Sequence, residues 1–317
     1  MSRRFILGTR ASRLARVQAE TVRAALQRHR PEQALAIQTL STEGDRTRDP
    51  RPTWGQGVFV KEIEVALLAG EIDLAVHSLK DVPTALPEGL VLAAITARAD
   101  PGDVLVTPTG AVLDDLPAGA VIGTSSLRRS AFLRAHRPDL RILPIRGNVD
   151  TRLRKLREGP SQAEGVRYDA LVLAASGLSR LGVADQDFTI HPIPFEVLLP
   201  APGQGALVVE TRADDTAVRA LVSAVHDPPT AAAVTAERLL LHDLGGGCHV
   251  PIAAGATTSP GDTLHLQGAV ASPDGSRVIR QWVTGPLTEA EALGAALAQH
   301  LLAAGAAELL AAPGVST

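Results

Sequence analysis

One short stretch, residues 244–251, holds the side chain best suited to covalent chemistry. It has the sequence Leu-Gly-Gly-Gly-Cys-His-Val-Pro and contains Cys248, the only cysteine in the 317 residues. Glycine leaves a neighbouring sulfur uncrowded and accepts backbone conformations that other residues avoid, and proline stiffens the chain that follows. Because a positioned thiolate is a strong nucleophile, the stretch suits a covalent role. Free cysteines are more often small buried apolar residues, so this stretch alone leaves a structural role open.

A carboxylate, Asp81, lies in a second polar stretch, His-Ser-Leu-Lys-Asp-Val-Pro at 77–83. It follows an expected strand over 72–76 and precedes a turn at Val82 and Pro83. A carboxylate in such a place stabilises a cation that forms on a substrate, or passes a proton to a leaving amine, if its pKa lies in the working range. A salt bridge or a turn cap is the alternative role for this aspartate.

Polar and cationic side chains follow five of the expected strands. Ligands of open α/β sheets bind beyond the carboxyl ends of the strands, so these side chains are expected to gather at one edge. Polar clusters at the ends of five strands are less readily explained by chance than one such motif would be. The clusters are Thr9, Arg10 and Ser12; Ser78, Lys80 and Asp81; residues 123–129; Arg146 with Arg152; and Ser176, Gly177 and Arg180.

The cluster at 123–129, Gly-Thr-Ser-Ser-Leu-Arg-Arg, has the character of an anion site. Its hydroxyls and free backbone N–H groups would meet the positive end of a helix dipole, and its two arginines add charge. The residue order is not that of a Walker phosphate-binding loop. A serine N-cap with solvated arginines explains the motif equally well, and residues 146–152 are open to a similar interpretation as a charged helix face. The side chains concerned are Thr124, Ser125, Ser126, Arg128 and Arg129.

Composition narrows the class of protein. The net charge of −3 argues against a nucleic-acid-binding protein. Only three of the 31 basic residues are lysines, and arginine is the side chain that grips carboxylates with paired hydrogen bonds. A single cysteine excludes an internal disulfide framework and a cysteine zinc site and suits a reducing compartment. No apolar run approaches a membrane span, and the apolar stretch after the basic start is interrupted by Gly8 and Arg10 and is too short for a signal peptide. We therefore expect a soluble cytoplasmic protein without a metal site.

The elements that must position these residues alternate between strands and helices. A first unit has expected strands at 4–7, 34–40, 72–76 and 90–95 and helices after Ser12 and over 59–68, with a long loop at 41–57. A second unit repeats the pattern with strands at 104–106, 120–122, 141–144 and 169–174 and helices at 127–135 and 149–157. Continuous apolar strands that alternate with helices are typical of parallel sheet covered on both faces. A strand at 206–210 is expected to return to the first unit.

The last hundred residues have a different pattern. Helices are expected at 215–225 and 230–241, followed by the Cys248 stretch and a hairpin of strands 264–272 and 277–283. Residues 288–291, Thr-Glu-Ala-Glu, predict a capping box that opens a final helix ending near Gly305. We therefore expect a small α+β domain with an antiparallel sheet.

Taken together, the motifs resemble the porphobilinogen deaminase (hydroxymethylbilane synthase) family. They fall in family order over nearly the whole chain, which is far more specific than any single motif. The matching stretches are residues 8–15, 59–62, 75–83, 123–129, 146–149 with Thr151 and Arg152, 203–205, 235–238 and 246–251.

The resemblance implies three domains joined by crossing segments near 97–103 and 195–202. Domain 1 would comprise 1–98 and 200–220, domain 2 would comprise 99–199, and both would be doubly wound like type II periplasmic binding proteins. Domain 3, over 221–317, would be the small α+β domain that carries the cysteine. We expect a monomer, because the sequence has no evident apolar surface helix.

The resemblance also implies the chemistry. A dipyrromethane cofactor would be held through a thioether at Cys248, and four porphobilinogen molecules would be added head to tail with loss of ammonia before hydrolysis releases the tetrapyrrole for haem biosynthesis. Asp81 matches the catalytic aspartate, which would face the pyrrole nitrogen of an azafulvene cation. Each ring brings an acetate and a propionate. The positions that match cofactor and substrate binding are Arg10, Ser12, Ser78, Lys80, Thr124, Ser125, Ser126, Arg128, Arg129, Arg146, Arg152 and Arg180.

Three departures and two rival functions remain. Glu43 and Gln56 stand where many relatives have cations, which leaves the contacts of the 42–57 loop open, and Gly245 stands where some relatives have an acid.

A non-catalytic anion-binding module would explain the arginines but not the glycine-flanked cysteine. A cysteine hydrolase that uses Cys248 and His249 is disfavoured, because adjacent side chains usually point apart and no orienting acid follows.

Overall fold

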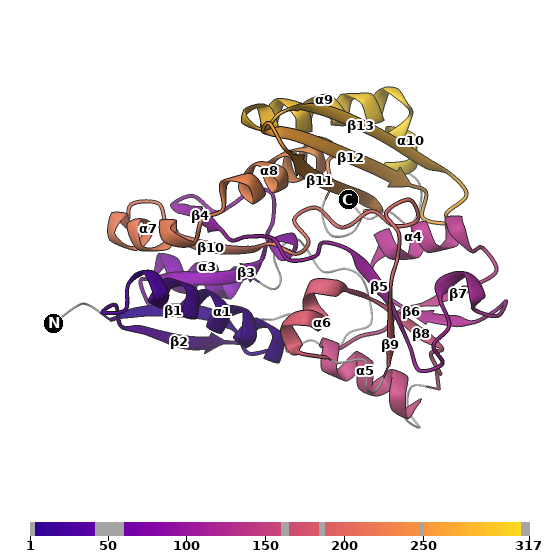
Figure 1. The fold of residues 1–317 in the computed structure, drawn as a ribbon, viewed down its shortest axis with the longest axis horizontal. Coiled ribbons are helices and arrows are strands. Elements are labelled where there is room, and N and C mark those ends of the chain that lie inside the picture. The colour runs from indigo at the N-terminus through magenta and orange to yellow at the C-terminus, as the bar shows by residue number, and fades with distance from the viewer. Residues whose placement is uncertain (1–3, 42–59, 160–164, 184–187, 247–249, 312–317) are drawn as a thin grey trace.

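A computed structural model describes residues 4–41, 60–159, 165–183, 188–246 and 250–311 of the chain. Three sheets organise these residues, two with five strands and one with three. The two five-stranded sheets lie side by side, and the three-stranded sheet lies against them (Figure 1). None of the helices in the described ranges has the length and apolar character of a membrane span.

The first sheet has the strand order β2-β1-β3-β10-β4. Strands β1, β2 and β3 run parallel, whereas β10 is antiparallel to both of its neighbours. Apolar residues such as Leu7, Leu74 and Val209 are buried on the face that α1 and α7 cover. The strands are Phe5–Arg10 (β1), Leu35–Leu40 (β2), Leu74–Ser78 (β3), Leu90–Ile95 (β4) and Leu207–Arg212 (β10), and the helices are Arg13–His29 (α1), Lys61–Leu68 (α3) and Thr216–Val222 (α7), with a short 3-10 turn at Leu79–Asp81 (η1).

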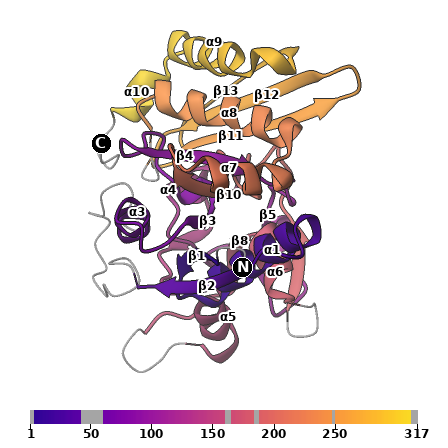
Figure 2. The same ribbon diagram turned by 90° about the vertical axis from the view of Figure 1, so that its left-hand side faces the viewer.

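The second sheet repeats that order as β7-β6-β8-β5-β9. Here β5 is the strand that runs antiparallel to its neighbours. Helix α1 of the first sheet lies beside α6 of the second (Figure 2). The strands are Asp103–Thr107 (β5), Val121–Gly123 (β6), Arg141–Leu143 (β7), Ala170–Ala174 (β8) and Thr189–Pro192 (β9); the helices are Leu127–His136 (α4), Val149–Glu158 (α5) and Ala175–Leu181 (α6), with a 3-10 turn at Leu113–Asp115 (η2).

Both sheets are therefore mixed: β1–β3 and β6–β8 form the parallel sheet that the apolar runs predict, and one antiparallel strand joins each of them. Each sheet takes one strand from chain that has just left the other sheet: β5 follows β4, and β10 follows β9. An arriving strand enters from the opposite side, so it runs against the strands beside it. Two crossing segments, 96–102 and 193–206, join the sheets.

A buried ion pair holds the two crossing segments together. Arg98, on the first, donates to both carboxylate oxygens of Glu237 at 2.7 and 2.9 Å, and its Nε donates to the carbonyl oxygen of Gln204 on the second. Glu237 also accepts from the backbone N–H of Gly203 and of Ala256, each at 2.7 Å. One helical carboxylate thus ties both crossing segments to the third sheet.

The third sheet is antiparallel, with the order β11-β12-β13. Helices α8 and α9 bury one face of it, and Ala253, Ala269 and Ala271 pack with Phe132 of α4 on the other. The expected hairpin is confirmed, and β11 is an additional strand beside it. The elements are Ser223–Val225 (η3), Pro228–Asp243 (α8), Ile252–Ser259 (β11), Thr263–Ala271 (β12), Val278–Pro286 (β13), Leu287–Glu289 (η4), Ala290–Ala303 (α9) and Ala306–Leu310 (α10).

Local differences from the sequence expectations have physical reasons. Ser12 caps α1 as expected by accepting from the N–H of Ala15 at 3.3 Å. The capping box at Thr288 is wrong: residues 287–289 form a 3-10 turn that leaves β13, so α9 begins after Glu289 without a side-chain cap. Strand β1 continues past Gly8 to Arg10, because β2 pairs with it over that length.

Candidate functional site

Asp81 ends a short 3-10 turn, η1, that follows β3. Leu79 and Val82 are buried on either side of it, and the N–H of Val82 donates to the carbonyl oxygen of Leu79, so the turn is anchored. The side chain of Asp81 is half-buried. Within the described residues, no hydrogen bond or ion pair engages its carboxylate. Neither of the two structural roles considered for Asp81, a salt bridge or a turn cap, therefore accounts for this carboxylate.

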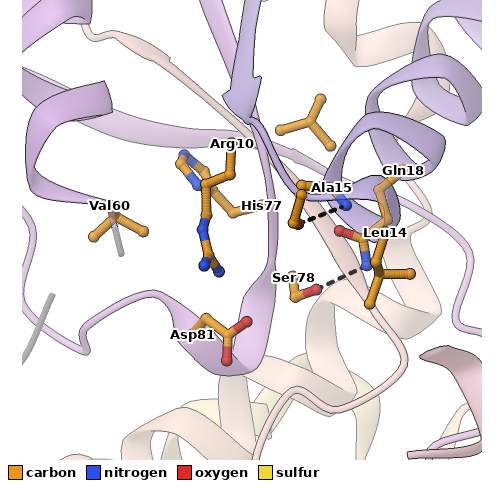
Figure 3. Close-up of a pocket in the computed structure, with 10 residues that line it drawn as sticks. Arg10, Leu14, Ala15, Gln18, Val60, His77, Ser78 and Asp81 are labelled. Atoms are coloured by element: carbon orange, nitrogen blue, oxygen red, sulfur yellow. Dashed lines mark hydrogen bonds between the residues drawn. The ribbon is translucent and has the colours of Figure 1, made fainter. Parts of the chain in front are cut away.

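Three cavities meet at Asp81, which is the one residue that lines all of them. The first has a volume of about 60 Å³ and is also lined by Arg10, Ser12, His77 and Ser78. Figure 3 shows the guanidinium group of Arg10 extending toward the carboxylate of Asp81. This cavity lies within the first sheet's own loops.

The second cavity, of about 200 Å³, lies where all three sheets approach one another. Its cationic walls come from η1 and from the start of α4, and Leu241, Val250 and Ile252 supply an apolar wall. The third cavity, of about 120 Å³, continues from Asp81 toward α5 and α6. The charged and hydroxyl residues of the second are Lys80, Ser126, Arg128 and Arg129; those of the third are Ser78, Lys80, Arg129, Arg152, Ser176 and Arg180.

The start of α4 places two buried arginines at the second cavity. Ser126 caps the helix by accepting from the N–H of Arg129, as the alternative interpretation of the motif predicts. Arg128 and Arg129 are 5% and 7% exposed, so they are not solvated arginines. Their guanidinium groups lie on either side of the carboxylate of Asp103, each with a nitrogen 2.7 Å from an oxygen. The arrangement is a built cationic wall rather than an exposed helix face.

Lys80 adds a third positive group to this wall. Its Nζ donates to Oε1 of Gln204 at 3.0 Å. Burial and the neighbouring charge of Arg129 lower the pKa of Lys80 to about 8, against the opposing effects of Asp81 and Asp103. A cation that the protein itself disfavours gains most from an anionic ligand.

Arg152 and Arg180 extend the positive lining into the third cavity. The Nε of Arg152 donates to the carbonyl oxygen of Gly147 at 2.8 Å, and Nη2 of Arg180 donates to that of Gly205 at 2.6 Å. Burial, followed by the charges of Arg129 and Arg146, lowers the pKa of Arg152 to about 10, so this side chain stays protonated at neutral pH. Arg146 is thus near enough to act on Arg152.

The structure does not bring every predicted residue to these cavities. Thr124, Ser125 and Arg146 line none of the three. Thr124 is buried and its Oγ1 accepts from the N–H of Ser126 at 3.3 Å, and Ser125 donates to the carbonyl oxygen of Ile145 at 2.7 Å. These hydroxyls shape the turn before α4. Cys248 and the 42–57 loop, with Glu43 and Gln56, lie outside the described residues.

Comparison with known proteins decides the family. The family model for the porphobilinogen deaminase dipyrromethane cofactor binding domain matches residues 5–220, and that for the porphobilinogen deaminase C-terminal domain matches residues 231–303. The chain belongs to the porphobilinogen deaminase family. A porphobilinogen deaminase of Geobacter metallireducens is 50% identical over 96% of this chain and 93% of its own length. One of Moorella thermoacetica is 51% identical over 96% and 95%, and one of Roseiflexus castenholzii is 48% identical over 98% and 100%.

The expected fold class is also confirmed as a mixed α/β protein with two five-stranded sheets and a small antiparallel C-terminal sheet. Among solved structures, a periplasmic binding protein of Salmonella typhimurium with high arginine specificity has a TM-score of 0.40 at 14% identity, covering 73% of this chain and 94% of that one.

The described residues suit the dipyrromethane cofactor of porphobilinogen deaminases. Such a cofactor is a polycarboxylate, and buried guanidinium groups with free donors are its natural partners. Lys80, Arg128 and Arg129 would hold its carboxylates in the second cavity. Val250, which begins the described chain just after the cysteine, lines that same cavity. Among the described residues, no cluster of three or more histidine, cysteine or acidic side chains is arranged to hold a metal ion.

Sequence reasoning missed several polar residues around the site. Gln18 of α1 donates to Oγ of Ser78 at 2.9 Å and lines two of the cavities. His77 lies 3.1 Å from the buried Glu210 of β10, and Asp103 lies behind the arginines. For Gln18 the one available signal is its place on the buried side of the helix that Ser12 caps. His77 stands inside an apolar strand, where a polar residue is unexpected, whereas no signal in the sequence marks Asp103.

Proposed function

We propose that this chain joins four porphobilinogen molecules head to tail with loss of ammonia, on a dipyrromethane primer held through a thioether at Cys248. The product would be hydroxymethylbilane, released by hydrolysis for haem biosynthesis. One observation carries the assignment of roles: among the described residues, Asp81 is the one carboxylate that lines the three cavities, and each of these cavities also has at least one cationic side chain in its wall. The primer supplies a nucleophilic pyrrole carbon when it is bound.

Asp81 is proposed as the catalytic carboxylate. When the aminomethyl nitrogen of porphobilinogen leaves, positive charge spreads onto the pyrrole N–H of the substrate. A carboxylate oxygen of Asp81 facing that N–H would lower the energy of this state, because it accepts the hydrogen bond most strongly when the charge is present. The absence of a partner for this carboxylate among the described residues leaves its oxygens available for the task.

The cationic side chains are proposed to bind the acetate and propionate groups. Arg128, Arg129 and Lys80 would hold carboxylates in the second cavity, and Arg152 and Arg180 in the third. Arg10 and Ser12, beside Ser78, would bind those of the ring in the first cavity. Ser126 lines the second cavity and caps α4, whereas Arg146, Thr124 and Ser125 would act from the edge of the site or through the turn that positions α4.

The domain division and the state of the protein are proposed as well. The two crossing segments support domain 1 as 1–98 with 200–220, domain 2 as 99–199 and domain 3 as 221–317. We propose a cytoplasmic monomer that does not bind nucleic acid. The single cysteine supports a reducing compartment, and light scattering on a size-exclusion column would test the monomer.

Intact-mass measurement tests the function. The purified protein should weigh two pyrrole units more than its sequence, and Cys248→Ser should lack that adduct. An unmodified protein that still makes product would refute the attachment, whereas an unmodified protein that only binds dicarboxylates would indicate an anion-binding module. A peptide or ester hydrolase activity lost in Cys248→Ser would indicate the cysteine hydrolase.

Asp81→Asn tests the catalytic role, because it removes the charge and keeps the shape. We expect the adduct to form on protein supplied with preformed hydroxymethylbilane, and turnover to fall by at least two orders of magnitude, the range for loss of one charge-stabilising group. Asp150→Asn, at an exposed ion pair with Arg13, is the matched control and should keep normal turnover. Near-normal turnover in Asp81→Asn would move the catalytic role elsewhere.

A further inference from the structure

Asp103 is a buried carboxylate for which the mechanism above has no use. It begins β5, directly after the first crossing segment, and is 1% exposed. It lines none of the three cavities but lies behind the arginines that do. Although burial alone would raise its pKa, the charges of Arg128, Arg129 and Lys80 hold the pKa of Asp103 well below its ordinary value, so it stays ionised.

Asp103 contacts both guanidinium groups, that of Arg129 by hydrogen bonds and that of Arg128 by an ion pair. Its Oδ1 accepts from Nε and Nη2 of Arg129 at 3.0 and 2.7 Å, and its Oδ2 lies 2.7 Å from Nη2 of Arg128. A backbone carbonyl anchors each arginine from a second side, Leu199 for Arg128 and Val172 for Arg129. Since a guanidinium group has five N–H donors, each arginine keeps donors for a ligand in the cavity.

Gln204 extends this anchor across the crossing segments. Its Nε2 donates to Oδ1 of Asp103 at 3.0 Å and to the carbonyl oxygen of Pro101 at 2.7 Å. Its Oε1 accepts from Nζ of Lys80 at 3.0 Å. One chain of contacts therefore runs from the arginines of α4 through Asp103 and Gln204 to the residue beside Asp81.

We propose that Asp103 is a positioning residue for carboxylate binding: it fixes the directions of the Arg128 and Arg129 forks and, through Gln204, their place relative to Lys80 and Asp81. This role rests on the proposed function, in which those cations hold the acetate and propionate groups. Asp103 also reduces the repulsion among three neighbouring cations. If Asp103 were only a counter-ion, it would reduce this repulsion but would not fix the directions of the guanidinium groups. Experiments can therefore separate the counter-ion role from the positioning role.

Two substitutions separate position from charge. Asp103→Glu keeps the negative charge but moves it by one methylene, so a counter-ion role survives and a positioning role does not. Asp103→Asn keeps the shape and removes the charge. The matched control is Asp73→Asn, because Asp73 is also a buried carboxylate, bonded to the N–H of Ile6 at 2.7 Å and 3.6 Å from Arg212, and it lines none of the cavities.

The full-length variants should be compared by melting temperature, by intact mass for cofactor loading, and by kcat and KM for porphobilinogen. We expect at least a tenfold rise in KM and a reduced loaded fraction for both Asp103 variants. Asp73→Asn should lower the melting temperature and leave loading and KM within twofold. The proposal is overturned if folded Asp103→Glu keeps both within twofold of the unsubstituted chain, or if Asp73→Asn raises KM as much. Should Asp103→Asn fail to fold, Asp103→Glu decides.

Competitive acylation of the three lysines gives a second readout, in which Asp73→Asn controls for a general loss of stability. The groups that act on Lys80 are Arg128 and Arg129, which disfavour its charge, and Asp81 and Asp103, which favour it. Asp103→Asn should therefore raise acylation of Lys80 several-fold near neutral pH, with Lys61 and Lys155 unchanged. An unchanged Lys80 rate would contradict the chain of contacts. Absence of both adduct and product in the unsubstituted protein would instead refute the proposed function, whatever Asp103 does.

Discussion

Lys80→Met is expected to stabilise the cofactor-free protein while it weakens the loaded one. In the fold, burial and Arg129 lower the pKa of Lys80 to about 8, whereas its ordinary value is 10.5. Below pH 8 the folded chain must therefore hold a charge that the unfolded chain accommodates more easily. Methionine has a similar length and no charge. The comparison is made in a Cys248→Ser background, so that no covalent cofactor compensates the lysine.

The magnitude follows from the difference between the two pKa values. About 2.5 pKa units, at ~1.4 kcal/mol each, amount to ~3.5 kcal/mol, of which ~3 kcal/mol is a cost in the folded state at pH 7, about one unit below the folded pKa. The substitution also removes the donor to Oε1 of Gln204, and loss of one hydrogen bond costs ~1 kcal/mol. The net expectation is a free energy of unfolding about 2 kcal/mol higher for Lys80→Met at pH 7.

The effect of Lys80→Met on the free energy of unfolding should depend on pH. Because the folded pKa lies below the unfolded one, the cost is fully present below about pH 8 and disappears as pH rises toward 10.5. The advantage of Lys80→Met should therefore shrink by about 2 kcal/mol between pH 7 and pH 9.5. In the loaded protein, ligand carboxylates favour the charged lysine, so the same substitution should destabilise it.

Urea unfolding followed by circular dichroism measures these differences. Lys61→Met, at an exposed position at the start of α3, is the control and should change the free energy of unfolding little at either pH. The reasoning is refuted if Lys80→Met destabilises the cofactor-free protein at pH 7, or if its effect is the same at both pH values.

Two further substitutions test the crossing segments. Glu237→Gln should lower the free energy of unfolding by about 3 kcal/mol or more in urea titrations, because it leaves Arg98 buried without its counter-charge. The control Glu158→Gln, at an exposed ion pair, should lower it by less than ~1 kcal/mol. Equal losses in the two variants would contradict the role of the buried pair. Gly205→Ala should lower both melting temperature and turnover, since φ is +91° and a Cβ would lie 2.3 Å from the carbonyl oxygen of Ala99. Gly119→Ala, at φ +79° in open space, should lower melting temperature only slightly; turnover retained in Gly205→Ala would argue against a role for that turn.

Local patterns in the sequence predicted most elements of the fold, because strands and helices leave their periodicity in a few neighbouring residues. Ser12 before an apolar helical repeat predicted the start of α1, and the apolar run before Gly177 predicted β8. The capping box at Thr288 failed for the opposite reason. Its residues match the pattern, but the chain leaving β13 keeps them in a 3-10 turn, and a local pattern carries no information about such a tertiary constraint.

The residues of the site likewise divide into those that the local sequence predicts and those that it does not. Asp81, Lys80 and the arginines of α4 stand in recognisable stretches at strand ends, and the structure gathers them around three adjoining cavities. Asp103 gave no such signal, because an aspartate after Pro-Gly at the start of a strand is typical of an exposed turn. Its burial depends on arginines from a distant helix and on Gln204, a hundred residues later. Such a partner set exists only once both crossing segments are in place.

The exchange of strands between the sheets explains why those partners meet. Because β5 and β10 each enter a sheet from the other one, the segments that precede them must pass between the sheets, where the cavities lie. Asp103 begins β5, and Gln204 and Gly205 precede β10, so groups that hold the cations belong to the segments that would bend if the sheets moved apart. Gly205 adds a second link, since its carbonyl oxygen accepts from Arg180 on α6. The hydrogen bonds of Asp103, Gln204 and Gly205 therefore tie the cations of the site to both crossing segments.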